Sequence, residues 1–87
     1  MGVGAQVHVG KGGTFDREGL SFGGFAKLRA RDGHSARVIV SVWTRDTDSV
    51  HFELAVGDSF EFADQTWRLD EIDDRSHRWY ATLTRVG

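Results

Sequence analysis

The chain has 87 residues, no cysteine and a formal net charge of −2 at pH 7. This length supports one domain over residues 1–87 with a modest core, and the missing cysteines exclude a disulfide framework and a thiolate metal site. A net acidic chain is a poor general binder of nucleic acid, and no apolar run approaches the roughly 20 residues of a membrane-spanning helix. We therefore expect a cytoplasmic domain with no membrane partner and no general nucleic-acid partner.

Strands are predicted along the whole chain, because 11 glycines divide it into short runs and no window keeps a helical apolar period. A first strand is expected at residues 4–9, followed by the glycine-rich turn at residues 10–13. A long strand over residues 20–31 contains the pair Gly23-Gly24. Adjacent glycines inside a strand predict a β-bulge or a corner at this point.

The middle of the chain predicts a three-stranded meander, in which the same face of the central strand pairs with apolar residues of both neighbouring strands. A three-residue loop at residues 32–34 would place Leu28 opposite Val38 and Arg29 opposite Arg37. The pairs expected on the other side of the central strand, all apolar and facing the core, are Val38–Leu54, Val40–Phe52 and Val42–Val50.

Residues 56–69 predict a hairpin around the two-residue turn Asp64-Gln65. The cross-strand pairs that agree with this register are Phe62–Trp67, Phe60–Leu69 and, on the opposite face, Glu61–Arg68. A bulge is expected near Asp70-Glu71, and a last strand is expected at residues 79–86. Both Trp67 and Trp79 are predicted to lie in the core.

About seven strands with a turn roughly every ten residues predict an all-β fold. We expect a small antiparallel β-barrel, because closing the sheet removes its exposed edges. The alternative is a two-sheet β-sandwich.

Three short motifs resemble chemical sites, but each lacks a required part. The G-x-S-x-G pattern at residues 19–23 has no following helix to form a nucleophile elbow. The loop at residues 10–14 lacks the first glycine and the Ser/Thr of a phosphate-binding loop, although its backbone N–H groups could form a small anion nest. The carboxylates at residues 70–74 do not follow the calcium-loop spacing, and the four histidines do not have metal-ligand spacing. We therefore expect no catalytic residue, no metal and no cofactor.

The strongest candidate for a binding surface is a basic and aromatic face. Four cationic side chains are predicted on the outer face of the meander, and directly opposed arginines need a neutralising partner. Acidic neighbours such as Glu53 would supply one, and an anionic ligand would supply another. Aromatic side chains on outward phases could stack on such a ligand. The predicted ligand-binding residues are Lys27, Arg29, Arg31, Arg37, Trp43 and Tyr80.

From residue 19 to the end, the chain resembles a family of short uncharacterised actinobacterial proteins. The segments that carry this resemblance are residues 20–22, 54–60 and 66–70 together with Trp79 and residues 83–86. The resemblance implies a compact β domain and a bacterial source. Because the family is a domain of unknown function, no functional residue follows from it.

Three functions are compatible with these observations. The first is a non-catalytic binding or accessory module that recognises a protein partner or a small anionic ligand through the basic and aromatic face. The second is a small β-barrel enzyme of bacterial specialised metabolism, of cyclase or isomerase type, with an interior pocket of at least about 300 Å³. The third is a structural homodimer formed through the outward residues Ile39 and Trp43.

Overall fold

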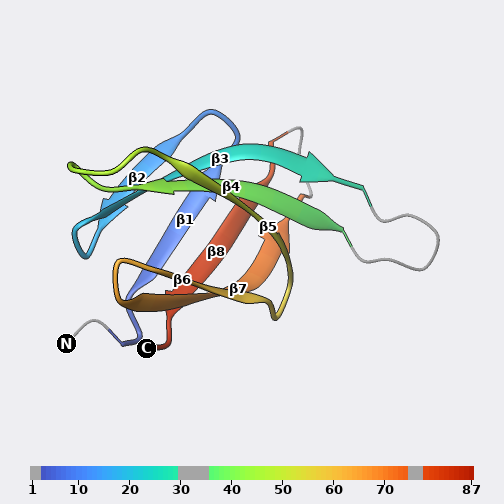
Figure 1. Cartoon of the computed structure of the whole chain (residues 1–87). Coiled ribbons are helices and arrows are strands. Elements are labelled where there is room, and N and C mark those ends of the chain that lie inside the picture. Colours follow the sequence, from blue (N-terminus) through green and yellow to red (C-terminus); the bar gives the residue numbers. More distant parts are fainter. Residues whose placement is uncertain (1–2, 30–35, 75–77) are drawn as a thin grey trace.

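The computed structural model describes residues 3–29, 36–74 and 78–87, and within these ranges the chain forms strands and no helix (Figure 1). The first sheet, in spatial order, contains β1 (Gln6–Gly10), β8 (Tyr80–Arg85), β7 (Gln65–Asp73) and β6 (Ser59–Phe62). The second sheet contains β2 (Thr14–Arg17), β3 (Leu20–Leu28), β4 (Arg37–Trp43) and β5 (Val50–Ala55). Every strand pair within the two sheets is antiparallel.

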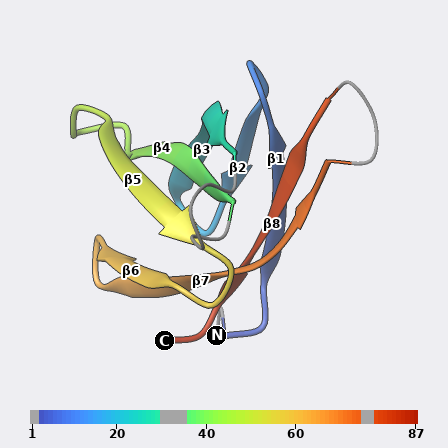
Figure 2. The same ribbon diagram turned by 90° about the vertical axis from the view of Figure 1, so that its right-hand side faces the viewer.

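The two sheets face each other and do not close into a barrel, as the two views together show (Figures 1 and 2). The all-β prediction is confirmed, but the sheets match the sandwich alternative and not the closed barrel. Two of the four edge strands, β2 and β6, have only four residues each. Short edge strands leave few unpaired backbone groups, so the fold limits its exposed edges without closure.

The core lies between the sheets and is built from alternate residues of both. The apolar side chains buried there are Ala5, Val7, Val9, Leu20, Phe22, Val38, Val40, Val42, Leu54, Phe60, Trp67, Leu69, Trp79, Ala81 and Leu83. The predictions for Trp67 and Trp79 are thus confirmed. Phe52 is half-buried and stacks on Phe60 of the other sheet, with ring centroids 4.4 Å apart. The core prediction is wrong for Val50, which begins β5 and is 43% exposed.

The predicted register between β4 and β5 is confirmed, since Val38 pairs with Leu54 and Val42 with Val50. The predicted register between β6 and β7 is wrong, because the turn lies one residue earlier in the chain than predicted. Phe60, and not Phe62, pairs with Trp67.

The two turn residues of the β6–β7 hairpin are Ala63 and Asp64, with φ of 52° and 63°. Two left-handed residues form the tight hairpin turn that matches strand twist, although alanine seldom adopts this conformation. The shift moves each partner by two residues, so the predicted inward and outward faces are retained.

The register between β3 and β4 differs from the prediction because β3 contains a bulge between Gly24 and Ala26. The bulge itself was expected from Gly23-Gly24, but its effect on the following residues was not. Beyond it, Lys27 pairs with the fully buried Val38, and Leu28 pairs with Arg37. Directly opposed residues share a face, so Lys27 lies on the inner side of the sheet. Arg29 is therefore not opposite Arg37.

The glycine-rich turn between β1 and β2 is attached to β3 immediately before this bulge. The amide of Gly12 donates to the carbonyl of Gly24 at 3.0 Å, and the amide of Gly24 donates to the carbonyl of Gly13 at 3.3 Å. A Cβ on Gly24 would lie 2.1 Å from the carbonyl oxygen of Gly10. Only glycine permits this approach, which places Lys11 beside β3. Strand β2, which follows the turn, was missed by the sequence analysis.

The predicted bulge at Asp70-Glu71 is confirmed, since Leu69 pairs with Leu83 while Glu71 pairs with Thr82. The Asp70 carboxylate accepts a hydrogen bond from Arg68 Nε at 2.6 Å and another from the Thr84 hydroxyl. The hydrogen bonds from Arg68 and Thr84 lower the pKa of Asp70 below its ordinary value. Ionised Asp70, which lies at the bulge, is thus held by a donor of its own strand, Arg68, and by a donor of β8, Thr84.

A pH dependence follows from the lowered pKa of Asp70. Ionised Asp70 stabilises the folded state above its unfolded pKa of about 3.9, and this stabilisation is lost as the pH falls through the lower folded pKa. We expect Asp70→Asn to lower the melting temperature at pH 7 and the difference from wild type to shrink below about pH 4. Thermal denaturation of both proteins between about pH 7 and pH 2 measures this effect. A difference that stays constant over the whole range would contradict it.

Candidate functional site

The predicted binding residues that the structure describes do not all lie on one surface. Arg31 lies outside the described residues, and the other five occupy four places. Lys27 and Arg29 line one pocket, Arg37 lies on the outer face of β4, and Trp43 lies at the other end of β4. Tyr80 belongs to the other sheet and lines a hollow that adjoins the pocket of Lys27 and Arg29.

Arg37 is neutralised by the acidic neighbour that the sequence analysis named. Its guanidinium forms an ion pair with Glu53 of β5, and both side chains are partly exposed. An ion pair of this kind contributes at most about 1 kcal/mol to stability. The contact nevertheless accounts for the charge of Arg37 without a ligand.

Trp43 is half-buried, and its ring lies against β3. A Cβ on Gly23 would lie 3.2 Å from the Trp43 ring, so the absence of a side chain at Gly23 makes room for the indole. The hollow beside Trp43 contains Arg17 and Arg45 together with acidic residues of the β2–β3 turn region. Its mixed charge distinguishes this hollow from a basic site.

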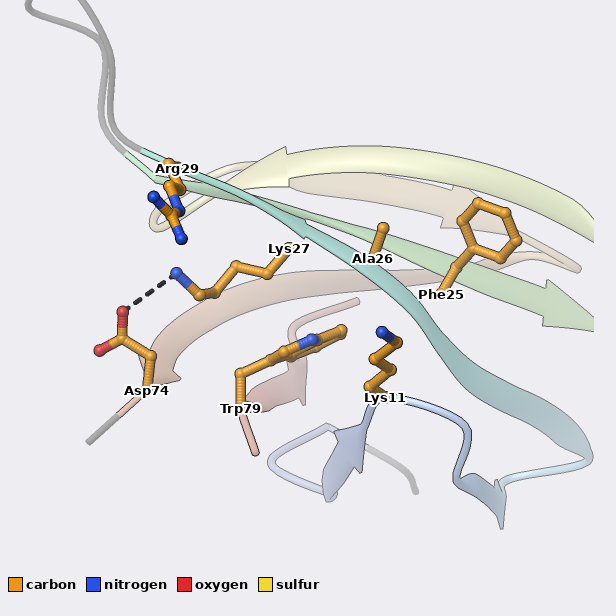
Figure 3. A pocket seen from close by; sticks show the side chains of 7 residues that line it. All are labelled: Lys11, Phe25, Ala26, Lys27, Arg29, Asp74 and Trp79. Atoms are coloured by element: carbon orange, nitrogen blue, oxygen red, sulfur yellow. Dashed lines mark ion pairs between the residues drawn. The ribbon is translucent and has the colours of Figure 1, made fainter. Parts of the chain in front are cut away.

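Lys27 and Arg29 line a surface pocket of about 440 Å³ at the end of β3 (Figure 3). The pocket brings together residues of the β1–β2 turn, β3, the end of β7 and the start of β8. The seven side chains that line it are Lys11, Phe25, Ala26, Lys27, Arg29, Asp74 and Trp79. We call it the Lys11–Arg29 pocket.

Cationic groups dominate the Lys11–Arg29 pocket. It contains three cations and one carboxylate, and Lys27 Nζ lies 3.1 Å from Asp74 Oδ2. Within the described parts of the chain, the side chains of Lys11 and Arg29 have no ion-pair or hydrogen-bonding partner. Two positive charges in one concave site therefore lack a neutralising group among these residues.

After the bulge, the residues of β3 that were predicted to face outward face inward, which explains why these charged side chains line the pocket. Lys27 lies on the inner side of β3, and its side chain is only 21% exposed. The Trp79 indole, itself 6% exposed, lies between Lys27 and Lys11 in Figure 3. Lysine stems can lie along an apolar ring while their charged ends stay in the open hollow, and the side chains in Figure 3 are placed for this.

Sequence reasoning missed Lys11, Asp74 and Trp79 as members of the pocket. Lys11 belongs to the glycine-rich loop, in which a backbone anion nest was considered, but its own side chain was not assigned a role. Asp74 was interpreted as part of a solvated hairpin end, and Trp79 only as a core residue. No signal in the sequence places these three segments together, because they are far apart in the chain.

Other chemical centres have little support in the described residues. Residues 3–29, 36–74 and 78–87 contain no group of three His, Cys, Asp or Glu residues that could hold a metal ion. In the same ranges, no helix is long and apolar enough to cross a membrane. The Lys11–Arg29 pocket is lined by three cationic side chains, one carboxylate and the Trp79 indole.

The chain is a small all-β protein with two antiparallel sheets and a surface pocket that three cationic residues line. Residues 4–87 match a family described as a family of unknown function, DUF6406, and the chain belongs to that family. Neither the curated proteins nor the solved structures contain a significant match to the chain. The resemblance to an uncharacterised family is thereby confirmed.

Proposed function

We propose that the protein is a non-catalytic binding module that holds a small anionic ligand in the Lys11–Arg29 pocket. The observation that carries this proposal is that three cationic residues, Lys11, Lys27 and Arg29, line one hollow, and that the carboxylate of Asp74, which also lines it, is already paired with Lys27. An arginine and two lysines provide the charge-assisted donors that phosphate and carboxylate groups accept. The site proposed here thus lies at the end of β3, whereas the sequence analysis expected it on the outer face of the meander.

The arrangement of the cations supports an anion more strongly than a structural role for the charges. Arg37 has a direct acidic partner, whereas Lys11 and Arg29 have none among the described residues. Each hydrogen bond to a charged group contributes about 1.5–3 kcal/mol. Removing one such donor from a bound anion should therefore weaken binding about tenfold or more.

Calorimetric titration with pyrophosphate at low salt tests the proposal. We expect Lys11→Gln and Arg29→Gln each to raise the Kd about tenfold or more, with little change in melting temperature because both side chains are exposed. Raising the salt concentration from about 20 to about 300 mM should also weaken binding, since exposed charges are screened.

Two arginine variants are the controls for this titration. Arg45→Gln removes the same charge beyond the other end of β4, and Arg37→Gln removes the charge of the outer face. Both should bind pyrophosphate nearly as the unaltered protein does. If Arg37→Gln weakens binding as much as Arg29→Gln, the outer face is the site. If pyrophosphate does not bind at all, the module has no anion site of this kind.

The other two predicted functions have less support. An interior substrate pocket would need space between the sheets, where Trp67 and Leu83 are fully buried and Phe52 stacks on Phe60. A homodimer through Ile39 and Trp43 would use side chains that are already half-buried in the monomer. A cytoplasmic location and a bacterial source remain predictions from the sequence.

A further inference from the structure

A second, smaller pocket of about 200 Å³ adjoins the Lys11–Arg29 pocket and shares Lys11 and Trp79 with it. Its other lining residues are His8, Gly10, Gly13, Thr14, Arg78 and Tyr80. We call it the Tyr80 pocket. Because two side chains line both hollows, one ligand could occupy both, with chemically different groups in each.

Tyr80 provides an exposed aromatic ring in this second pocket. It is 45% exposed, and a Cβ on Gly10 would lie 3.0 Å from two of its ring carbons. The ring therefore lies close against the bare Cα of Gly10, its pairing partner across β1 and β8. A ring held from one side and open to solvent elsewhere is a platform on which a planar group can stack.

Acidic residues limit how far an anionic ligand can extend. Asp74 also lines a neighbouring hollow with Glu71 and Asp73. A long polyanion leaving the Lys11–Arg29 pocket in that direction would meet like charges, which disfavour it. The charge distribution thus favours a ligand that ends in this pocket over a continuous nucleic-acid strand.

We infer that the ligand is a free nucleotide, with its phosphates at Lys11, Lys27 and Arg29 and its base stacked on Tyr80. This inference rests on the proposed function and names the ligand class of the same site. The cations supply donors for a diphosphate, and the exposed phenol ring supplies a surface for any base. The shared residue Lys11 lies where the phosphate and base regions meet.

The test compares ADP, pyrophosphate and adenosine as calorimetric ligands at low salt. ADP should bind at least about fivefold more tightly than pyrophosphate, because base stacking adds to the phosphate contacts. Tyr80→Ala should remove this advantage and leave pyrophosphate binding unchanged. Tyr80→Phe keeps the ring and should retain the advantage, while thermal denaturation checks that both variants are folded.

The outcomes distinguish the nucleotide inference from the anion-binding function on which it rests. Equal affinities for ADP and pyrophosphate would overturn the nucleotide inference and leave the anion-binding function standing, whereas no binding of either would overturn both. An ADP advantage that survives Tyr80→Ala would overturn the placement of the base. A single-stranded DNA of about ten nucleotides should bind more weakly than ADP, and tighter binding would overturn the short-ligand argument.

Discussion

Replacing Trp67 with alanine is expected to lower the free energy of unfolding by about 4 kcal/mol, within the range for large aromatic-to-alanine changes in cores. Trp67 is fully buried and meets the Phe22 ring edge-on, with centroids 4.9 Å apart. Its indole Nε1 donates to Gln65 Oε1 at 3.0 Å, and Gln65 Nε2 donates to the Glu18 carbonyl at 2.8 Å. Trp67 therefore joins the two sheets both by packing and through this hydrogen-bonded chain.

This loss is large because a domain of this length is expected to have only about 5–10 kcal/mol of net stability. Urea denaturation followed by circular dichroism measures the change. Trp67→Phe is the matched control, since it keeps a ring against Phe22 and loses the indole donor, and it should cost about 1–2 kcal/mol. A loss below about 1 kcal/mol for Trp67→Ala would show that the core between the sheets is loosely packed.

The part of the fold that could be predicted best is the pairing of β4 with β5. Valines occupy every second position of β4, and the inward positions of β5 are apolar at the same period, so a single register satisfies both strands. Such alternation determines which face is buried and is independent of the rest of the chain. Val50 was misassigned because alternation gives the face of a residue but not whether the opposite sheet extends over it.

The β6–β7 turn shows where agreement among cross-strand pairs misleads. A turn at Asp64-Gln65 avoids placing alanine at positive φ, yet the chain adopts φ of 52° at Ala63. The observed register pairs Phe60 with Trp67, and tertiary packing of these two buried rings outweighs the local preference of one alanine. The faces were still predicted correctly, because the pairing changed by an even number of residues.

The candidate site could not be predicted because it depends on a bulge and on long-range contacts. The two glycines indicated a bulge, but its position decides whether Lys27 and Arg29 or Ala26 and Leu28 lie inward. Polar residues are ordinarily assigned outward, and that assignment fails here because Lys27 and Arg29 lie at an open pocket. The position of Lys11 depends on a contact with β3 that no local pattern indicates.

Gly24→Ala is expected to destabilise the protein by about 3 kcal/mol and to impair anion binding in the protein that still folds. The added Cβ would lie 2.1 Å from the Gly10 carbonyl oxygen and 3.1 Å from the Lys11 amide nitrogen. These are backbone atoms that no side-chain rotation can move away. The β1–β2 turn must therefore shift from β3, with loss of the hydrogen bonds that Gly24 makes to Gly12 and Gly13.

Gly13→Ala is the matched control for this substitution. It lies in the same turn, its φ is not in the left-handed region, and its added Cβ would lie 3.5 Å from the Gly10 oxygen, an ordinary contact. It should change stability by less than about 1 kcal/mol, since alanine at a compatible position mainly reduces the freedom of the unfolded chain. Urea denaturation of both variants gives the comparison, and equal losses would contradict the backbone clash.

The binding measurement on Gly24→Ala connects the fold to the proposed site. A shift of the β1–β2 turn moves Lys11 away from Lys27 and Arg29, so pyrophosphate affinity should fall below that of Gly13→Ala under conditions where both proteins are folded. Unchanged affinity with reduced stability would mean that Lys11 contributes little and that the charges of β3 hold the anion alone. The close approach at Gly24 would then serve only the packing of the two sheets.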